Sequence, residues 1–528
     1  MPTKLLALLL ATLVLGACSH EPIITDTANG TLRGYLDEGV EHYLGVPYAQ
    51  APLGDLRWRP PQPAKPWEGI LEVQDNPPAC LQFIPLKKSL VGSEDCLYLN
   101  VWVPAQRPEQ PLPVMVWLHG GGFILGKGSF SDHDGRELAA QGKVIVVSVD
   151  YRLGVFGFMA HPALNTEVAG HPGSGNYGIE DQTAALRWVQ DNISAFGGDP
   201  NKVTVFGQSA GAISVCAQLA SPLAKGLFQR AVIQSGPCAN PLPDLAAASA
   251  LGSQVAAGLG CDQTPDELAC MRAQPAQDVA DVLPPDPTLG FNESSTLWWP
   301  VLDGHVLPLQ FMDAFESGRF NQVPVINGTT RDEATLLIWM SHNLWFKPLQ
   351  AEQYPQRLDF LLDDPAMARV VEQRYPLENY ASPFDALVAA FSDGFFKCQA
   401  RWQSQAMSKY VPIWTYQFDY DQAPFLIPWA DLKAFHAAEI QFVFGRPMRI
   451  PMGSFNEQES RLAGSMQGYW VQFAGSGDPN GGGQLFWPAY DNSVQTMLFN
   501  LENSVSGGVG VQACRFWEGL NYLRPVYR

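Results

Sequence analysis

The sequence predicts an α/β fold with a large, mostly parallel central sheet that is flanked by helices. Two observations support this. Short runs rich in β-branched apolar residues are separated along the chain by helical patterns. Within each run, apolar residues follow one another directly instead of alternating with polar ones. Continuous apolar runs are typical of strands buried on both faces, as in parallel sheets. The predicted strands cover residues 114–118, 144–149, 203–206 and 231–234. Residues 178–196 have the apolar spacing of a helix.

Length and composition describe a large, loop-rich globular protein. The 528 residues are 46% hydrophobic, which excludes general disorder and a polytopic membrane protein. Length alone suggests roughly three domains. The 48 Gly and 43 Pro are spread along the chain, however, which indicates one fold with long loop insertions, such as the aromatic, Pro-rich segment 284–300. Because the net charge is −19, we expect no nucleic-acid partner.

The N-terminus has the pattern of an export signal. Residues 1–15 contain one Lys followed by an apolar run that is too short to span a bilayer. The run ends in Leu-Gly-Ala-Cys18, which resembles a bacterial lipobox, where the cysteine is acylated. The alternative is a plain signal peptide with an incidental Cys. We therefore expect a lipoprotein signal peptide at 1–17 and a tether at 18–28. The lipid on Cys18 is the only membrane contact expected, and Ser19 after it favours the outer membrane.

Export to an oxidising compartment allows the cysteines to pair. The chain has nine cysteines, and the lipobox uses one. Spacing alone does not determine which of the others are joined.

The segment 203–219 has the pattern of a nucleophile elbow, in which a strand runs through Gly-x-Ser-x-Gly into a helix. The turn is so tight that its neighbouring positions must be small, which explains Gly207 and Gly211. The strained turn lifts the Ser209 hydroxyl clear of the sheet edge. The predicted helix, residues 212–219, then begins close to the serine, and its N-terminus favours developing negative charge. Ser209 is the candidate nucleophile of an α/β-hydrolase fold.

A glycine run supplies the second part of an acyl-transfer site. His119-Gly-Gly-Gly-Phe123 follows the predicted strand 114–118. Glycines let backbone N–H groups approach a substrate oxygen without interference from side chains. We expect the N–H groups of Gly121, Gly122 and Ala210 to form the oxyanion hole.

The chain resembles the type-B carboxylesterase family, which includes cholinesterases and bacterial para-nitrobenzyl esterases. The similarity runs from about Gly30 to Trp517. The segments that carry it are Tyr43–Ala49, Ser93–Asn100, Asp150–Gly154, Asn176–Gln182 and Phe196–Pro200. The resemblance implies a single α/β-hydrolase domain at 29–528, a serine carboxylic-ester hydrolase acting through an acyl-enzyme (EC 3.1.1.-), and no cofactor. We expect a monomer. A shorter group resembling hormone-sensitive lipase shares the His-Gly-Gly-Gly run but lacks the Ser-Glu-Asp-Cys segment.

The resemblance also assigns the partners of Ser209. Of the nine histidines, those after Ser209 are His305, His342 and His436. Family segments match at 327–333, where the last residue, Glu333, is the acid, and at 435–445, which supplies His436 as the base. Asp332 is the competing acid. His119 and His305 are expected to be structural and His171 to lie at the surface. No metal-ligand spacing is present.

The resemblance also implies three disulfides that are found in the family: Cys80–Cys96, Cys261–Cys270 and Cys398–Cys514. Cys216 is then expected to be a buried, small apolar residue, and Cys238 stays unassigned. The resemblance also suggests two buried ion pairs, Arg57–Glu94 and Arg152–Asp181, whose alternative is surface charge.

Two departures from the cholinesterases predict a neutral, apolar ester substrate. Gln208 stands before the nucleophile, where many relatives have Glu. The Cys80–Cys96 loop is short and holds no Trp to stack on a cation. Aromatic residues that would line the pocket, or else belong to the core, are Phe123, Trp298, Trp299, Trp339 and Phe346. The alternative functions are a non-catalytic binding or adhesion protein on the same scaffold, and a hydrolase specialised for polymer or xenobiotic esters.

Overall fold

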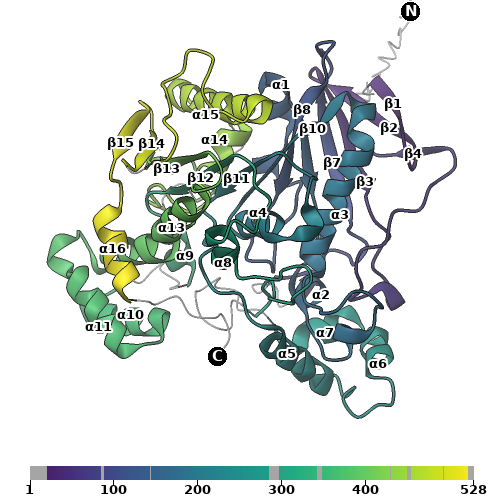
Figure 1. Ribbon diagram of the computed structural model, residues 1–528, viewed down its shortest axis with the longest axis horizontal. Coiled ribbons are helices and arrows are strands. Elements are labelled where there is room, and N and C mark those ends of the chain that lie inside the picture. Colours follow the sequence, from purple (N-terminus) through teal and green to yellow (C-terminus); the bar gives the residue numbers. More distant parts are fainter. Residues whose placement is uncertain are drawn as a thin grey trace, which may run out of the picture.

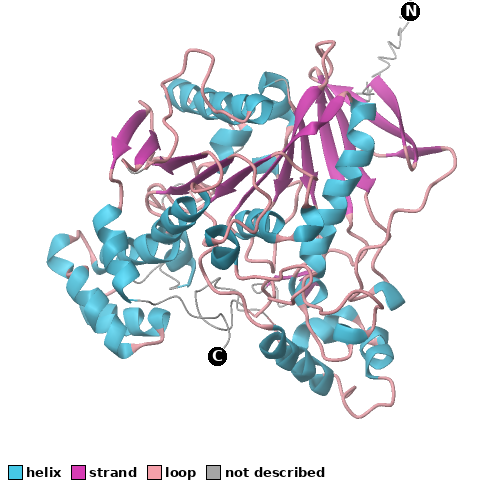
Figure 2. Cartoon of the chain, viewed as in Figure 1, coloured by secondary structure: helices cyan, strands magenta, loops and turns pink. Residues whose placement is uncertain are grey.

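The computed structural model describes residues 21–84, 89–142, 144–284, 297–341, 348–427, 430–448, 453–491 and 493–520. The expected signal peptide, Cys18, His342 and Phe346 lie outside them. A mixed 13-stranded sheet runs through the molecule in the order β1-β2-β3-β7-β9-β8-β10-β11-β12-β13-β14-β15, with β4 paired to β2 (Figures 1 and 2). From β9 to β14 every pair is parallel. The predicted mostly parallel α/β sheet is therefore confirmed.

The strands of the large sheet are β1 (Glu21–Thr27), β2 (Gly30–Asp37), β3 (Val40–Pro47), β4 (Ile70–Glu72), β7 (Tyr98–Pro104), β8 (Leu112–Leu118), β9 (Ile145–Val149), β10 (Gly198–Gln208), β11 (Arg230–Gln234), β12 (Val325–Thr330), β13 (Ile413–Phe418), β14 (Gln495–Phe499) and β15 (Ser504–Gly507). A separate hairpin pairs β5 (Gln82–Ile84) with β6 (Ser89–Val91).

The helices are α1 (Arg136–Gly142), α2 (Gly154–Phe158), α3 (Tyr177–Asn192), α4 (Ala210–Ala220), α5 (Leu245–Gly258), α6 (Glu267–Ala273), α7 (Ala276–Val282), α8 (Phe311–Glu316), α9 (Ala334–Ser341), α10 (Tyr354–Leu362), α11 (Pro365–Arg374), α12 (Pro383–Phe391), α13 (Cys398–Met407), α14 (Ile440–Phe444), α15 (Glu457–Ser476) and α16 (Val511–Leu520). Figure 1 shows α1, α14 and α15 together on one side of the sheet, and α3 and α4 on the other.

Strand β8 illustrates why the sheet is covered on both faces. Val114, Val116 and Leu118 belong to the core under α3 and α4, whereas Met115 and Trp117 belong to the core under α14 and α15. Successive side chains of a strand point to opposite faces, so a continuous apolar run is required when both faces are buried. A third core joins α10, α12 and α16.

The structure corrects several predicted boundaries. The helix predicted at 178–196 ends at Asn192, and a 3₁₀ turn, Ile193–Phe196, follows it. Strand β10 extends the predicted 203–206 in both directions, and α4 begins directly after Ser209 rather than at residue 212. Within the expected tether, residues 21–27 form strand β1, which is hydrogen-bonded along β2. A tether must leave its backbone free, so this part belongs to the domain.

Candidate active site

Ser209 occupies a strained turn between β10 and α4. Its backbone has φ 58° and ψ −123°, a conformation that non-glycine residues rarely adopt. A β-carbon at Gly211 would lie 1.9 Å from the Leu118 carbonyl oxygen, and one at Gly207 would lie 2.5 Å from the Gly211 carbonyl oxygen. Both positions therefore require glycine, as the sequence predicted.

The glycine run lies beside this turn. A β-carbon at Gly120 would lie 3.2 Å from Cβ of Ser209. Gly121 and Gly122 both have positive φ, at 115° and 61°. A β-carbon at Gly121 would lie 2.0 Å from the Leu125 carbonyl oxygen. Because α4 begins at Ala210, the N–H of Ala210 has no partner within its helix and can serve a substrate oxygen. The glycine run thus starts beside Ser209 at Gly120, and Ala210 follows Ser209 directly.

His436 and Glu333 come together from two loops at the same edge of the sheet. His436 Nδ1 lies 2.6 Å from Glu333 Oε2. Glu333 is fully buried, and its other oxygen accepts a hydrogen bond from the Thr330 N–H at 2.7 Å. The ring of Phe396 packs on the His436 ring, with 4.9 Å between the centroids. These contacts fix the orientation of the imidazole.

Glu333 determines which nitrogen of His436 carries the hydrogen. A carboxylate oxygen accepts, so Nδ1 carries the hydrogen and donates it to Glu333. Nε2 then carries none, which is the tautomer that a general base needs. The Gln208 side chain lies beside it, with 3.1 Å between its amide nitrogen and His436 Nε2.

Asp332, the competing acid, has other partners. Its carboxylate pairs with Arg331 at 2.8 Å and accepts a hydrogen bond from the Ala434 N–H at 3.2 Å. Its own backbone N–H donates to the Ala434 carbonyl oxygen. Asp332 therefore ties the loop that carries His436 to the loop that carries Glu333, whereas Glu333 alone of the two contacts the imidazole.

A second buried carboxyl, Glu439, lies behind the pair formed by Glu333 and His436. The Gln234 amide donates to it at 3.3 Å, and the Trp470 indole N–H in turn donates to Gln234 at 3.2 Å. Burial, and then the charge of Glu333, raise the pKa of Glu439 to about 7. Nothing in the sequence pattern indicated that Glu439 is a buried carboxyl next to Glu333 and His436.

The pKa of Glu439 predicts a stability that depends on pH. The ordinary value for a Glu, 4.5, applies to the unfolded chain, so the folded state binds the additional proton between pH 4.5 and about 7. Stability is therefore lost as the pH rises through this window, and ionised Glu439 costs about 3 kcal/mol above it. We expect Glu439→Gln to gain stability relative to wild type as the pH rises from 5 to 8.

Urea unfolding at pH 5 and pH 8, with the disulfides intact, measures this effect. A difference in free energy of unfolding between variant and wild type that does not change with pH would contradict it.

The expected pocket aromatics divide into two groups. Phe123 and Trp299 pack edge to face at 5.2 Å, next to the glycine run. Trp298 is 2% exposed and belongs to the same core cluster. Trp339 packs against the core on the other face of the sheet.

The remaining histidines are held by their surroundings. His119 is stacked on Tyr151, and its Nδ1–H donates to the Gly120 carbonyl oxygen at 2.8 Å. Burial lowers the pKa of His119 to about 3, so the ring is neutral. His171 was expected at the surface, but its side chain is mostly buried and pairs with Glu180 of α3 at 2.6 Å, which raises the pKa of His171. The ring of His305 packs on it.

The three expected disulfides are present, and the structure adds a fourth, Cys216–Cys238. The expectation that Cys216 is merely a small apolar residue is wrong. Helix α4 packs against β11, and Cys238 follows that strand, so the two cysteines meet with 6.4 Å between their Cα atoms.

Both expected ion pairs are also present, with Arg152–Asp181 buried and Arg57–Glu94 partly buried. Arg57 and Glu94 pair at 2.6 Å, and Arg152 and Asp181 at 2.7 Å. Each is bidentate, so neither is ordinary surface charge.

Among the residues that the structure describes, no three or more His, Cys, Asp or Glu are grouped to hold a metal ion. No helix in this part of the chain is long and apolar enough to cross a membrane.

Known proteins resemble the chain over nearly its whole length. A model described as the carboxylesterase family matches residues 21–517. A para-nitrobenzyl esterase of Bacillus subtilis (strain 168) is 35% identical over 91% of this chain and 96% of its own. A fumonisin B1 esterase of Sphingopyxis macrogoltabida is 35% identical over 93% of this chain and 90% of its own. A solved structure of PNB esterase superposes with a TM-score of 0.78 at 35% identity, covering 94% of this chain and all of that one.

Proposed function

The chain belongs to the carboxylesterase family and is a serine hydrolase of carboxylic esters, and we propose that it cleaves neutral, apolar esters through an acyl-enzyme on Ser209. In this proposal Glu333 and His436 complete the triad, and Gly121, Gly122 and Ala210 provide the oxyanion hole. The observation that carries it is the contact between His436 Nδ1 and the Glu333 carboxylate, because it leaves Nε2 unprotonated beside Gln208, the residue that precedes Ser209.

The reaction proceeds in two halves. The Ser209 oxygen attacks the ester carbonyl carbon while His436 Nε2 takes the hydroxyl proton, and the three backbone N–H groups bind the resulting oxyanion. The bond to the alcohol oxygen then breaks, and His436 returns the proton to the leaving alkoxide. A water, deprotonated by His436, attacks the acyl carbon. The bond to the Ser209 oxygen then breaks, His436 returns the proton to that oxygen, and the carboxylic acid leaves. Throughout, Glu333 stabilises the imidazolium.

The proposed preference for neutral substrates rests on Gln208. Gln208 is 2% exposed and contacts His436, so it lies within the site but brings no charge. A carboxylate at this position would attract a cationic alcohol, because Coulomb attraction is strong where water is excluded.

Gln208→Glu tests the preference for neutral substrates. We expect the ratio of kcat/KM for butyrylthiocholine to kcat/KM for a neutral thiobutyrate ester to rise about tenfold, equivalent to ~1.4 kcal/mol. The ratio cancels any general loss of activity. It should also fall with added salt in the variant more than in wild type. A ratio that stays constant or decreases would refute the role given to Gln208.

We also propose that the protein is exported and held at the bacterial outer membrane by acylated Cys18, with residues 1–17 removed, and that it acts as a monomer. Strand β1 begins at Glu21, so Ser19 and His20 alone separate Cys18 from the folded domain. The anchor would therefore keep the domain close to the membrane surface.

Cys18→Ala tests the anchor. Since several acyl chains bind a membrane stably, we expect wild type to sediment with the outer membrane and the variant to be recovered in the soluble fraction with unchanged kcat. If wild type and variant distribute alike between the fractions, the anchor is refuted.

A further inference from the structure

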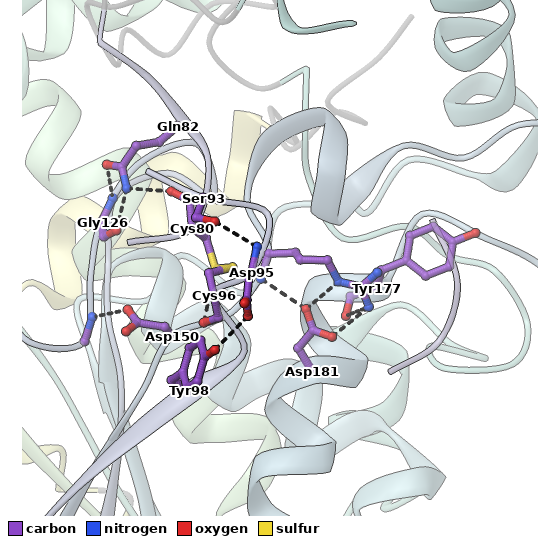
Figure 3. Close-up of a disulfide and its surroundings, with 12 residues drawn as sticks. Cys80, Gln82, Ser93, Asp95, Cys96, Tyr98, Gly126, Asp150, Tyr177 and Asp181 are labelled. Atoms are coloured by element: carbon purple, nitrogen blue, oxygen red, sulfur yellow. Dashed lines mark hydrogen bonds and ion pairs between the residues drawn. A yellow bond between two sulfur atoms is a disulfide. The ribbon is translucent and has the colours of Figure 1, made fainter. Parts of the chain in front are cut away.

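Gln82 holds the end of the glycine loop from outside that loop. It lies two residues after Cys80, at the start of β5, and is 6% exposed. Its side-chain amide forms a reciprocal pair with the backbone of Gly126 (Figure 3). The Gly126 N–H donates to Gln82 Oε1 at 3.0 Å, and Gln82 Nε2 donates to the Gly126 carbonyl oxygen at 2.9 Å.

Gly126 closes the loop that carries the oxyanion donors. The Leu125 N–H donates to the Gly121 carbonyl oxygen at 3.0 Å, so Gly121 and Leu125 belong to one tight turn. A β-carbon at Gly126 would lie 2.5 Å from the Gly120 carbonyl oxygen and 2.3 Å from His119 Nδ1. The end of the loop thus packs on its beginning, and a displacement of Gly126 displaces the glycines that bind the oxyanion.

The segment that carries Gln82 is itself held by a disulfide and by hydrogen bonds. The Cys80–Cys96 disulfide joins its segment to the chain just before β7, and both sulfurs belong to buried residues. The Leu81 N–H donates to the Ser93 carbonyl oxygen at 3.1 Å, and Gln82 Nε2 also donates to the Cys80 carbonyl oxygen at 3.1 Å. The amide is therefore fixed relative to the central sheet.

We propose that Gln82 is a positioning residue for the oxyanion hole, with the Cys80–Cys96 disulfide as its anchor. The inference rests on the proposed function. The glycine N–H groups bind the oxyanion more strongly than the ground-state ester, so a misplaced loop lowers kcat more than it changes KM. Asp150 holds the following turn by accepting the Gly128 N–H at 2.7 Å, so the loop stays attached when Gln82 is lost.

Gln310 offers a matched control. It forms the same reciprocal amide pair with the backbone of Leu242, at 2.7 and 3.0 Å, far along the chain from the glycine loop. Gln82→Leu and Gln310→Leu each remove one such reciprocal pair while keeping the side-chain volume similar, and Gln82→Leu also removes the hydrogen bond to the Cys80 carbonyl oxygen. The loss of a reciprocal amide pair is thus common to both variants, whereas its position beside the glycine loop belongs to Gln82 alone.

The experiment compares these variants with wild type for p-nitrophenyl butyrate hydrolysis, melting temperature and inhibition by a trifluoromethyl ketone, whose tetrahedral adduct requires the oxyanion hole. We expect Gln82→Leu to lower kcat about 10- to 100-fold and to leave KM within about threefold of wild type. The inhibition constant of the ketone should rise by a factor comparable to the loss of kcat. Gln310→Leu should keep kcat within about threefold of wild type.

Equal loss of kcat in both variants, or a kcat of Gln82→Leu within threefold of wild type, would overturn the proposal. Gln82→Glu is the second variant, because it keeps the acceptor for the Gly126 N–H and replaces the donor with an oxygen that faces the Gly126 and Cys80 carbonyl oxygens. If Gln82→Leu does not fold, a kcat of Gln82→Glu equal to wild type overturns the proposal, and a drop with unchanged KM supports it. Fluorophosphonate labelling of wild type at Ser209 separates this outcome from failure of the proposed function.

Discussion

Ser209→Ala is expected to lower kcat for p-nitrophenyl acetate and butyrate by about 10⁵-fold with little change in KM. The reason is that the turn at φ 58° presents one hydroxyl to the carbonyl carbon, and an alanine offers no nucleophile there. The substrate still binds, because the glycine run and the aromatic residues near it are unchanged. The measurement is steady-state hydrolysis at several substrate concentrations, with the spontaneous rate subtracted.

Ser214→Ala is the control for this variant. Ser214 lies on α4, the helix that follows Ser209, and is fully buried, and its hydroxyl accepts a hydrogen bond from Gln182 at 2.8 Å. Its loss should cost about 1 kcal/mol of stability and leave kcat within threefold. If the Ser209 variant hydrolyses either ester as fast as wild type, the proposal that Ser209 is the nucleophile fails, and the binding-protein alternative gains support.

Glu333→Gln is expected to lower kcat by about 10³- to 10⁴-fold at nearly unchanged KM. The carboxylate accepts the hydrogen of His436 Nδ1 at 2.6 Å and balances the imidazolium that forms during the reaction. An amide in its place is neutral and, if its nitrogen faces the ring, reverses the tautomer, so that Nε2 carries the hydrogen and cannot take one from Ser209.

Asp332→Asn is the matched variant, because it makes the same chemical change one residue away. Asp332 contacts Arg331 and Ala434 rather than the imidazole, so its variant should lose stability and less than tenfold in kcat. If Asp332→Asn loses more activity than Glu333→Gln, the assignment of the acid is reversed.

Local patterns were enough to predict the parts of the site that are local in sequence. The strand-to-helix turn at Ser209 needs small residues within two positions of it, and the glycine run follows a strand directly. Both signals are short-range consequences of sterics, and so is the burial of β8 on both faces. Strand and helix ends were less predictable, since tertiary hydrogen bonds extend β10 beyond its β-branched core.

Contacts between distant segments needed either the resemblance or the structure. Glu333 and His436 are 103 residues apart, and only family similarity related them. No such similarity covered Cys216 and Cys238, which meet because α4 packs on β11. Gln82 acts on a backbone group 44 residues away, and a backbone partner leaves no side-chain pattern to recognise. His171 was misplaced for a different reason, because loop geometry brings its side chain to that of Glu180, nine residues later.

In the proposed mechanism one serine, Ser209, forms the acyl-enzyme. The most direct test is to react the protein with one equivalent of a fluorophosphonate, follow the remaining esterase activity, and locate the adduct by peptide mass spectrometry. We expect activity to fall in proportion to labelling, with the adduct on Ser209 and none in Ser209→Ala. An adduct on another residue, or full activity in protein whose Ser209 is completely labelled, would contradict it.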